Sequence, residues 1–289
     1  MQMIFGITEN DIMTKKPEWL RIPYTDNESN AYVSELLGEL GLNTVCIEAN
    51  CPNRSECFSK KTATFMILGS ICTRKCTFCN IGFGEPHTVD INEPKRIALA
   101  VKKLALKYVV ITSVTRDDLH DGGAMHFSDA ITAVRNLVPA IKIEVLIPDL
   151  QELKCITDKS PEVISHNIET VKSLYAAVRP EAGYERSLSV LSEIKKLNPE
   201  IYTKSGLMLG LGENKNDVLK TFDDLLEAKC DFLTIGQYLS PSKNHYPVYE
   251  YIEPGIFKEY KETALNLGFK HVASAPLVRS SYKADEFIY

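Results

Sequence analysis

The cysteines constrain this chain of 289 residues more than any other feature, because six of the eight lie between Cys46 and Cys79. Persistent disulfides are disfavoured in a reducing compartment, where clustered thiols more often hold a metal. The six thiols form two groups, with the spacings C-x4-C-x5-C and C-x3-C-x2-C. The chain is therefore expected to fold around two sets of metal ligands. Cys155 and Cys230 lie outside this stretch and are expected to be inert packing residues.

The second group, Cys72-Thr-Arg-Lys-Cys76-Thr-Phe-Cys79, directly follows the first predicted strand. Three thiolates on one short loop can bind three irons of a cubane iron–sulfur cluster and leave the fourth iron open, because full ligation takes four protein ligands. A structural zinc site is the alternative. Zinc also takes four ligands, commonly from paired C-x2-C motifs or from histidine, and His87 is the nearest histidine.

The first group, Cys46-Ile-Glu-Ala-Asn-Cys51-Pro-Asn-Arg-Ser-Glu-Cys57, has a spacing that is uncommon for zinc. Buried free cysteines are the alternative, but so polar a loop would pack poorly in a core. Two separate clusters, one for each group, are the simpler interpretation. The Asn, Pro and Ser content also predicts a loop rather than a regular element.

Alternating strands and helices indicate a parallel sheet with crossover helices. Short apolar runs predict buried strands at Thr64–Leu68, Tyr108–Ile111, Ile141–Ile147, Val163–Ser165, Gly206–Leu211 and Phe232–Ile235. Helical stretches between them lie at Pro94–Leu106, His126–Leu137, Arg186–Leu197 and Asp217–Ala228. Six strands are too few for an eight-stranded barrel, so we expect an α/β fold with a partial (β/α)6 barrel. A doubly wound sheet is the alternative.

Three segments divide the chain. Residues 1–61 form an N-terminal extension around the first cysteine group, irregular over residues 1–29 and with a helix at Asn30–Leu40. Residues 62–240 form the barrel, and residues 241–289 form a C-terminal tail with one helix, Pro254–Leu267. Sites in such folds gather at the carboxyl ends of the parallel strands. Those ends carry polar and small residues, namely Cys72, Cys76, Cys79, Thr112, Ser113, Asn167, Gly210, Gly212, Glu213 and Gln237.

Charge and hydropathy exclude several other classes of protein. The formal net charge is -5, with acidic and basic residues interspersed, so neither nucleic acid nor a bilayer surface is an expected partner. No run of 18 apolar residues occurs that would form a membrane-spanning helix. The segment Met1–Lys16 does not read as a secretory signal, so we expect a cytoplasmic location.

The C-x3-C-x2-C loop after a first strand is typical of the radical S-adenosylmethionine (SAM) superfamily. Together with the C-x4-C-x5-C group it resembles the lipoyl synthase family, over most of the chain from Lys16 to Ala284. Further matching segments are Ala63-Thr-Phe-Met-Ile-Leu-Gly69, Val114-Thr-Arg-Asp-Asp-Leu-His-Asp-Gly-Gly123, Glu144-Val-Leu-Ile-Pro-Asp149, His166-Asn-Ile-Glu-Thr-Val171, Thr203-Lys-Ser-Gly-Leu-Met-Leu-Gly-Leu-Gly-Glu213 and Val278-Arg-Ser-Ser-Tyr282.

The resemblance implies two 4Fe–4S clusters. Cys72, Cys76 and Cys79 would bind the cluster that reduces SAM to methionine and a 5′-deoxyadenosyl radical. The first group would bind an auxiliary cluster, whose sulfides are inserted at carbons 6 and 8 of an octanoyl-lysine on a lipoyl-carrier protein. Implied partners are these octanoylated carrier domains, a reductant protein such as flavodoxin or ferredoxin, and an iron–sulfur carrier that renews the auxiliary cluster.

The resemblance also implies a serine as the fourth ligand of the auxiliary cluster, from Arg279-Ser280-Ser281-Tyr282. We assign Ser281, with Ser280 as the alternative. Oxygen is a harder ligand than a thiolate and binds a soft iron less well, so this ligand is expected to leave during sulfur transfer. Without the resemblance, a turn or helix-cap serine would be the preferred interpretation.

Four places are candidates for SAM binding. Gly206, Met208 and Gly210 resemble the superfamily's adenine-side strand, although strand glycines are often bulges. The other candidates are Ser113, Asn167, Glu169 and Arg179. The alternative role for Asn167 is to cap a helix. The alternative for Arg179 is a surface salt bridge.

The charged segment from Arg116 to Asp121 is expected to cap a loop rather than to transfer protons. Three residues depart from the family pattern, namely Ser70, Ala275 and Lys283. A biotin synthase-like enzyme and a non-catalytic zinc or iron–sulfur module are the alternative functions.

Overall fold

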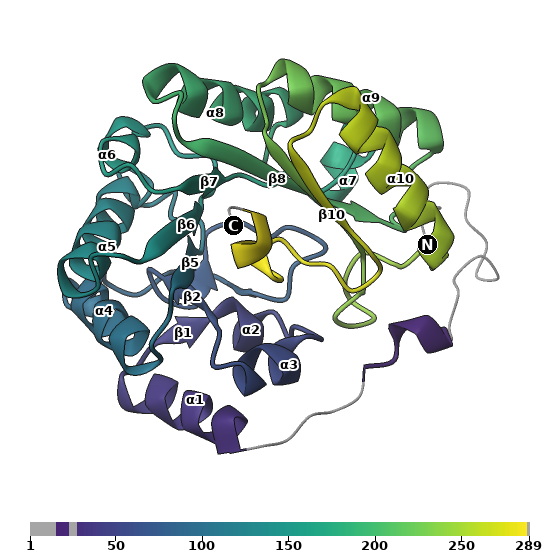
Figure 1. Ribbon diagram of the computed structural model, residues 1–289. Coiled ribbons are helices and arrows are strands. Elements are labelled where there is room, and N and C mark those ends of the chain that lie inside the picture. Colours follow the sequence, from purple (N-terminus) through teal and green to yellow (C-terminus); the bar gives the residue numbers. More distant parts are fainter. Residues whose placement is uncertain (1–15, 23–27, 288–289) are drawn as a thin grey trace.

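The computed structural model of the chain describes residues 16–22 and 28–287, and the statements on structure below concern these residues. The expectations for a secretory signal, and for most of the irregular N-terminal segment, fall on residues outside them. Strands form a ring with helices around its outside (Figure 1). The main sheet contains β1 (Asn43–Thr44), β2 (Thr64–Ile67), β5 (Tyr108–Ser113), β6 (Lys142–Leu146), β7 (Val163–Ser165), β8 (Tyr202–Leu209), β9 (Phe232–Gln237) and β10 (His271–Ser274).

The order of the strands distinguishes a partial barrel from a doubly wound sheet. From β2 to β10 the strands of this sheet are parallel, and each pairs with the strand of the same sheet that follows it along the chain. A doubly wound sheet reverses its order at a switch point, and this sheet does not. Strand β1 pairs antiparallel with β2 at one edge, and β10 forms the other edge. The sheet is therefore a curved, open barrel, as the sequence predicted.

The longer helices cover the outside of the strands (Figure 1). They are α1 (Glu28–Glu39), α4 (Glu93–Lys103), α5 (Ala124–Leu137), α8 (Tyr184–Leu197), α9 (Lys215–Glu227) and α10 (Pro254–Leu267). Short helical segments are η1 (Glu18–Leu20), α2 (Val45–Glu48), α3 (Arg54–Ser59), α6 (Lys154–Thr157), η2 (Lys172–Leu174), α7 (Tyr175–Val178) and η3 (Ala284–Phe287). None of the helices in the described part of the chain is long and apolar enough to cross a membrane.

Apolar side chains fill the space between the strands and the outer helices, in two main clusters. Phe65 of β2 and Phe127 of α5 belong to the cluster on the N-terminal side, and both are fully buried. Phe222 of α9 and Phe257 of α10 belong to the other. Because the helices take up the apolar outer face, the inner face of the sheet is free to carry polar groups.

The ring of strands encloses a buried ion pair near the amino ends of the strands. Lys204 of β8 and Glu144 of β6 have no exposed side-chain surface, and Lys204 Nζ lies 2.5 Å from Glu144 Oε1. Tyr108 and Ser165 donate hydrogen bonds of 2.7 Å each to the same carboxylate. The ring of Phe287, in η3, lies 4.8 Å from the ammonium group.

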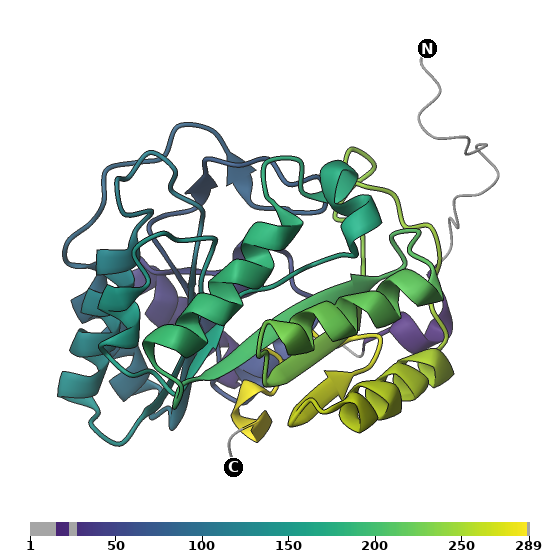
Figure 2. The ribbon, with the colours of Figure 1, turned by 90° about the horizontal axis from the view of Figure 1, so that it is seen from above.

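The two ends of the barrel differ. The short strands β3 (Ile71–Cys72) and β4 (Gly82–Phe83) lie at the end where the parallel strands finish. Figure 2 shows them opposite the C-terminal turn η3, which in Figure 1 lies inside the ring of strands. The segment that leads to η3 therefore passes through the barrel.

The structure corrects several details of the predicted elements, and it contains the short strands β1, β3 and β4, which were not predicted. The tail adds the strand β10 to the sheet, whereas only a helix was expected there. The first cysteine group contains the short helices α2 and α3 where a loop was expected, and Thr44 caps α2 by accepting a hydrogen bond from the Ile47 amide. Strand β8 begins at Tyr202, four residues before the predicted Gly206.

Candidate active site

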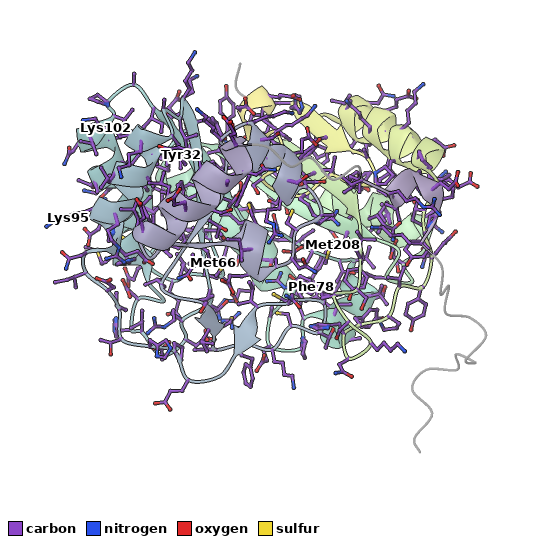
Figure 3. All side chains as sticks on the ribbon, turned by 90° about the horizontal axis from the view of Figure 1, so that it is seen from below. Tyr32, Met66, Phe78, Lys95, Lys102 and Met208 are labelled. Carbon is purple, nitrogen blue, oxygen red and sulfur yellow. The ribbon has the colours of Figure 1, made fainter. Side chains whose placement is uncertain are left out.

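One cavity of about 1420 Å³ runs through the barrel and brings the two cysteine groups together. All six clustered cysteines line it, with residues of β2 and β5–β9 and the tail from Val278 to Glu286. Met66, Phe78 and Met208 also line it, and Figure 3 shows them in the middle of the molecule, whereas Lys95 and Lys102 lie on the outside of α4.

The second cysteine group lies on the loop after β2 and is fixed through Arg74. The guanidinium donates from Nε and Nη2 to Asp117, at 2.7 and 2.6 Å, and from Nη1 to Asp149 at 2.5 Å. Such forked pairs hold a side chain in one orientation. The loop is therefore tied to the segments after β5 and β6. Asp149 belongs to a matching segment of the resemblance, but neither its contact nor that of Asp117 was predicted.

Burial affects the Cys76 and Cys79 thiols of the second group. It raises the pKa of Cys79 to about 12. It also raises the pKa of Cys76, although the nearby Arg179 guanidinium offsets part of this rise. In the free protein these thiols are neutral, so binding a metal releases their protons.

The loop of the second group also contacts the first group and the C-terminal part of the chain. Asn80 donates from its amide to the Glu48 carbonyl, between Cys46 and Cys51, at 2.8 Å. The His245 Nε2 and the Cys79 carbonyl lie 3.1 Å apart. The hydrogen bond from Asn80 to Glu48 thus connects the segments that carry the two cysteine groups.

The first cysteine group lies at the edge of the sheet, beside β1 and the amino end of β2. Burial raises the pKa of Cys46 to about 11 and that of Cys57 to about 12. Burial also raises the pKa of Cys51, against the opposing charges of Arg279 and Arg54. Three thiols thus line one part of the cavity wall.

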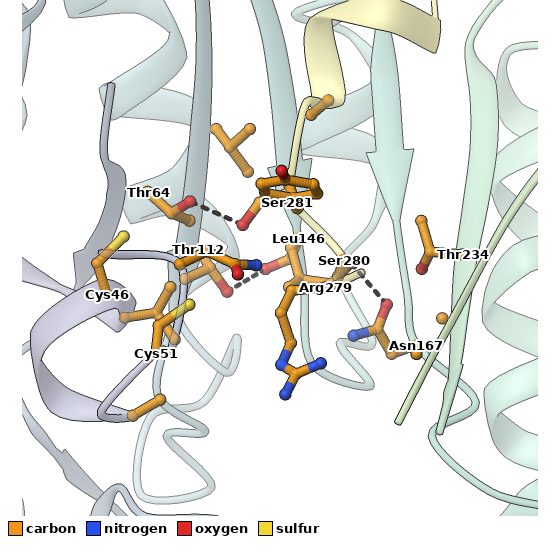
Figure 4. Close-up of a pocket in the computed structure, with 18 of the residues that line it drawn as sticks. Cys46, Cys51, Thr64, Thr112, Leu146, Asn167, Thr234, Arg279, Ser280 and Ser281 are labelled. Carbon is orange, nitrogen blue, oxygen red and sulfur yellow. Dashed lines mark hydrogen bonds between the residues drawn. The ribbon is translucent and has the colours of Figure 1, made fainter. Parts of the chain in front are cut away.

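The tail crosses the cavity and places Ser281 beside the first group. Thr64, at the start of β2, donates a hydrogen bond of 2.8 Å from its hydroxyl to the Ser281 Oγ (Figure 4). Tyr282 donates to a Glu56 carboxylate oxygen at 3.0 Å, and Asn53 donates to the Leu277 carbonyl at 2.7 Å. These three bonds join the tail to the start of β2 and to the N-terminal segment.

The neighbouring Ser280 faces the other side of the cavity. Its hydroxyl donates a hydrogen bond of 3.0 Å to the Asn167 Oδ1 (Figure 4). Of the two candidate serines, Ser281 is therefore the one beside the thiols of the first group. Ser280 lies beside a residue predicted to bind SAM.

Two of the residues predicted to bind SAM have polar atoms without a partner. Ser113 Oγ and Arg179 Nε are buried and make no hydrogen bond within the described part of the chain. Arg179 donates from Nη1 to the Asn167 carbonyl at 3.0 Å and to the Tyr175 hydroxyl at 2.6 Å. Since buried polar atoms are normally hydrogen-bonded, a polar ligand such as SAM fits this part of the cavity.

Glu169 lies beside Asn167 in an uncommon backbone conformation with a φ of 66°. The Asn167 amide donates to its carboxylate at 3.0 Å. Burial raises the pKa of Glu169, opposed by the charge of Arg179. Such a conformation in a residue other than glycine is kept only where the surroundings enforce it, and it is frequent at ligand sites.

The three residues of the predicted adenine-side strand have different environments. Gly206 and Met208 line the cavity. A Cβ at Gly206 would lie 2.9 Å from the Asn167 side chain, so only glycine leaves this room. Gly210 lies outside the residues that line the cavity, with a φ of 91°, and a Cβ there would lie 2.3 Å from the Glu250 carbonyl. Its position is explained by a tight turn, in which its amide donates to Glu213.

The charged segment after β5 is structural, as expected. Arg116 forms a forked pair with Asp118, and the Asp121 carboxylate accepts from the Gly123 and Met125 amides at the start of α5. Cys230 is buried outside the cavity, and Cys155 is half-buried. Of the departures from the family pattern, Lys283 lines the cavity and pairs with Glu286 at 3.5 Å.

The arrangement of the ligands bears on the zinc alternative. Among the described residues, no group of three or more His, Cys, Asp or Glu side chains is arranged to hold a single metal ion. A structural zinc ion draws its four ligands into one tetrahedron. The six clustered thiols instead line one large cavity in two groups of three.

Comparison with known proteins identifies the family. The model of the radical SAM superfamily matches residues 66–225. The chain is 60% identical to a lipoyl synthase of Caldicellulosiruptor saccharolyticus over 279 residues, covering 95% of this chain and 98% of that protein. It is 55% identical to a lipoyl synthase of Caldicellulosiruptor bescii over 275 residues, covering 94% of each chain.

Solved structures show the same fold at low sequence identity. Streptococcus suis SuiB bound to S-adenosylmethionine has a TM-score of 0.57 at 13% identity, covering 76% of this chain and 54% of that one. Methylornithine synthase has a TM-score of 0.54 at 13% identity, covering 87% of this chain and 84% of that one. From its sequence relatives and its partial barrel, the chain belongs to the lipoyl synthase family of radical SAM enzymes.

Proposed function

We propose that this enzyme inserts two sulfur atoms, at carbons 6 and 8 of an octanoyl-lysine on a lipoyl-carrier protein, to form the lipoyl group. Cys72, Cys76 and Cys79 hold the 4Fe–4S cluster that works with SAM. The N-terminal segment to residue 61 provides Cys46, Cys51 and Cys57 for an auxiliary 4Fe–4S cluster. The C-terminal segment 241–289 provides Ser281 as the fourth ligand of that cluster.

The residues of the cavity have separate tasks in this proposal. When bound, SAM and the cluster held by Cys72, Cys76 and Cys79 supply an organic radical that removes hydrogen atoms. The auxiliary cluster is the substrate that donates sulfur. Ser113 and Arg179 offer free hydrogen-bonding atoms to the amino-acid part of SAM, and Asn167 and Glu169 offer polar groups to its ribose. The glycine at position 206 leaves room for the ligand beside the strand.

One observation carries the proposal. A tail residue more than 200 positions away in the sequence, Ser281, is held 2.8 Å from Thr64, beside the first cysteine group and in the cavity that also holds the second. A biotin synthase-like activity gives no reason for this arrangement. The sequence identity of 60% to a lipoyl synthase over nearly the whole chain also disfavours it.

The direct test combines the reconstituted protein with an octanoyl-lysyl peptide, SAM and a reductant under anaerobic conditions. We expect about eight irons per chain and a peptide product that carries two added sulfur atoms by mass. About four irons, or a peptide without added sulfur despite SAM cleavage, would contradict the proposal. A peptide with an unmodified lysine is the matched control.

Partners and location follow from the same chemistry. Electrons come from a small reductant protein such as flavodoxin or ferredoxin, because no other redox group is implied by the sequence. The auxiliary cluster is consumed, so an iron–sulfur carrier must renew it. The thiols must stay reduced, so we place the reaction in the cytoplasm.

A further inference from the structure

Arg279, at the start of the Arg-Ser-Ser-Tyr segment, lines the cavity. Its guanidinium donates a hydrogen bond of 2.7 Å from Nη1 to the carbonyl of its neighbour Val278. No ion pair joins it to a carboxylate within the part of the chain that the structure describes. Figure 4 shows the guanidinium between Cys51 and Asn167, pointing away from the tail.

Arg279 is half-buried. A cation in such a place normally has an anionic partner, because removing charge from water is costly. Two of the carboxylates that line the cavity have other partners. Glu56 is bound by Lys60 and by Tyr282. Glu169 accepts from the Asn167 amide. The partner of Arg279 is therefore expected to be an anion that enters the cavity.

The position of Arg279 in the cavity distinguishes two possible anions, the carboxylate of SAM and the auxiliary cluster. The carboxylate of SAM has its own candidate partners in Arg179 Nε and Ser113 Oγ, which make no hydrogen bond within the described residues. Arg279 lies two positions before Ser281, and its charge acts on Cys51 in the first cysteine group. A 4Fe–4S cluster with three thiolates and one serine oxygen is itself an anion, because its ligands outweigh the positive charge of its core.

We infer that Arg279 is the charge partner of the auxiliary cluster and raises its reduction potential; this inference rests on the proposed function. Reduction adds negative charge to the cluster, so a cation in contact with it stabilises the reduced form more than the oxidised form. Charge and hydrogen bonds near a cluster set its potential. The effect is strong in a cavity wall, where solvent screens poorly.

The test uses a full-length background in which Cys72, Cys76 and Cys79 are all changed to Ala, so that only the auxiliary cluster is present. In this background Arg279→Gln is compared with Arg279→Lys and with the parent. Arg54→Gln is the matched control, because Arg54 also lies beside the first group but is exposed to solvent. The readouts are iron content and the midpoint potential, from a titration followed by electron paramagnetic resonance.

We expect about four irons in the parent background and a more negative potential in Arg279→Gln. Arg279→Lys should keep most of the parent potential, and Arg54→Gln should shift it much less. Loss of the cluster in Arg279→Gln but not in Arg279→Lys would also support the inference. An unshifted Arg279→Gln potential, an equal shift in Arg54→Gln, or loss of the cluster in both Arg279 variants would overturn the inference alone. A parent background without any cluster would overturn the auxiliary cluster and the inference together.

Discussion

In the proposed function, Ser281 is the residue that distinguishes the first cysteine group from an ordinary cluster site. Its oxygen accepts a hydrogen bond of 2.8 Å from the Thr64 hydroxyl and lies in the cavity that the three thiols line. An oxygen ligand binds the soft iron of a cluster more weakly than a thiolate does. A weak ligand suits a cluster that must be opened so that its sulfur can leave.

Replacing this oxygen by sulfur tests that interpretation. Ser281→Cys should retain about eight irons per chain, because cysteine is the usual ligand of such clusters. Product formation should fall by roughly a factor of ten or more, the scale on which changes around metal ligands act. The assay is the mass of the octanoyl-lysyl peptide after reaction. Full product from Ser281→Cys would show that the ligand does not have to leave.

Thr64 orients the Ser281 hydroxyl, so its own hydroxyl should matter. Thr64→Val keeps the shape of the side chain in β2 but removes the hydrogen bond. We expect a loss of roughly 10- to 100-fold in product formation or in retention of the auxiliary cluster. Thr132→Val is the control, because Thr132 bonds only within its helix, to the Ser128 carbonyl. Equal rates of product formation in Thr64→Val and Thr132→Val would show that the Thr64 hydroxyl has no role in the site.

The sequence predicted a metal-binding role for the clustered cysteines, but not the contacts that support them. Thiols at short, regular spacings point to metal binding within a single segment. Thr64 and Ser281 are 217 positions apart, and Arg74 and Asp117 are 43 apart. The sequence contains no local pattern that joins such pairs, because the fold alone brings them together. Ser281 was assigned only through a resemblance, and the chemistry of serine would have favoured a turn.

At the scale of elements, the tail between β10 and η3 is the connection between the barrel and the first cysteine group. It passes so close to β9 that a Cβ at Gly236 would lie 2.1 Å from the Val278 carbonyl. The Pro276 carbonyl also accepts a hydrogen bond of 3.1 Å from the Gln237 amide. The glycine in β9 therefore fixes the path of the tail.

Gly236→Ala should displace the tail while the barrel remains folded. Overpacking of this kind costs about 1–3 kcal/mol, and the tail is the part that can move. We expect SAM cleavage to continue and sulfur insertion to be lost, measured as methionine and product in one reaction. Gly255→Ala, at the exposed start of α10 where a Cβ meets nothing, is the control. Unchanged sulfur insertion in Gly236→Ala would show that the tail's path is not critical.

The regular elements could largely be predicted because their apolar runs are strong. Strand β7 and helix α10 occupy the predicted residues. Strand β10, His271-Val-Ala-Ser274, was missed because its residues are only partly apolar and partly buried at the edge of the sheet. The helices α2 and α3 were missed because Asn, Pro and Ser indicate turns, and here these residues lie around helices of only a few residues.

At the scale of the whole molecule, the pair formed by Lys204 and Glu144 joins two non-adjacent strands inside the barrel. Both side chains are completely buried, and Tyr108 and Ser165 satisfy the remaining capacity of the carboxylate. Removing one partner of a buried pair leaves an uncompensated charge, which typically costs 3–5 kcal/mol, that is about a third of the stability of many domains.

Lys204→Met should therefore lower the free energy of unfolding by about 3–5 kcal/mol, measured by urea denaturation of the reconstituted protein. The double variant Lys204→Met with Glu144→Gln should lose less than the single variant, because no charge remains buried. Lys229→Met, on an exposed lysine after α9, is the control. A loss below about 1 kcal/mol in Lys204→Met would show that the pair is not critical to the barrel.

The central claim is that two sets of three thiols in one cavity have different functions, one in SAM cleavage and the other in sulfur insertion. It is tested by the mass of the octanoyl-lysyl peptide made by a variant with Cys46, Cys51 and Cys57 all changed to Ala. The claim predicts that this variant retains about four irons and still cleaves SAM, but adds no sulfur to the peptide. A peptide with two added sulfur atoms from this variant would contradict it.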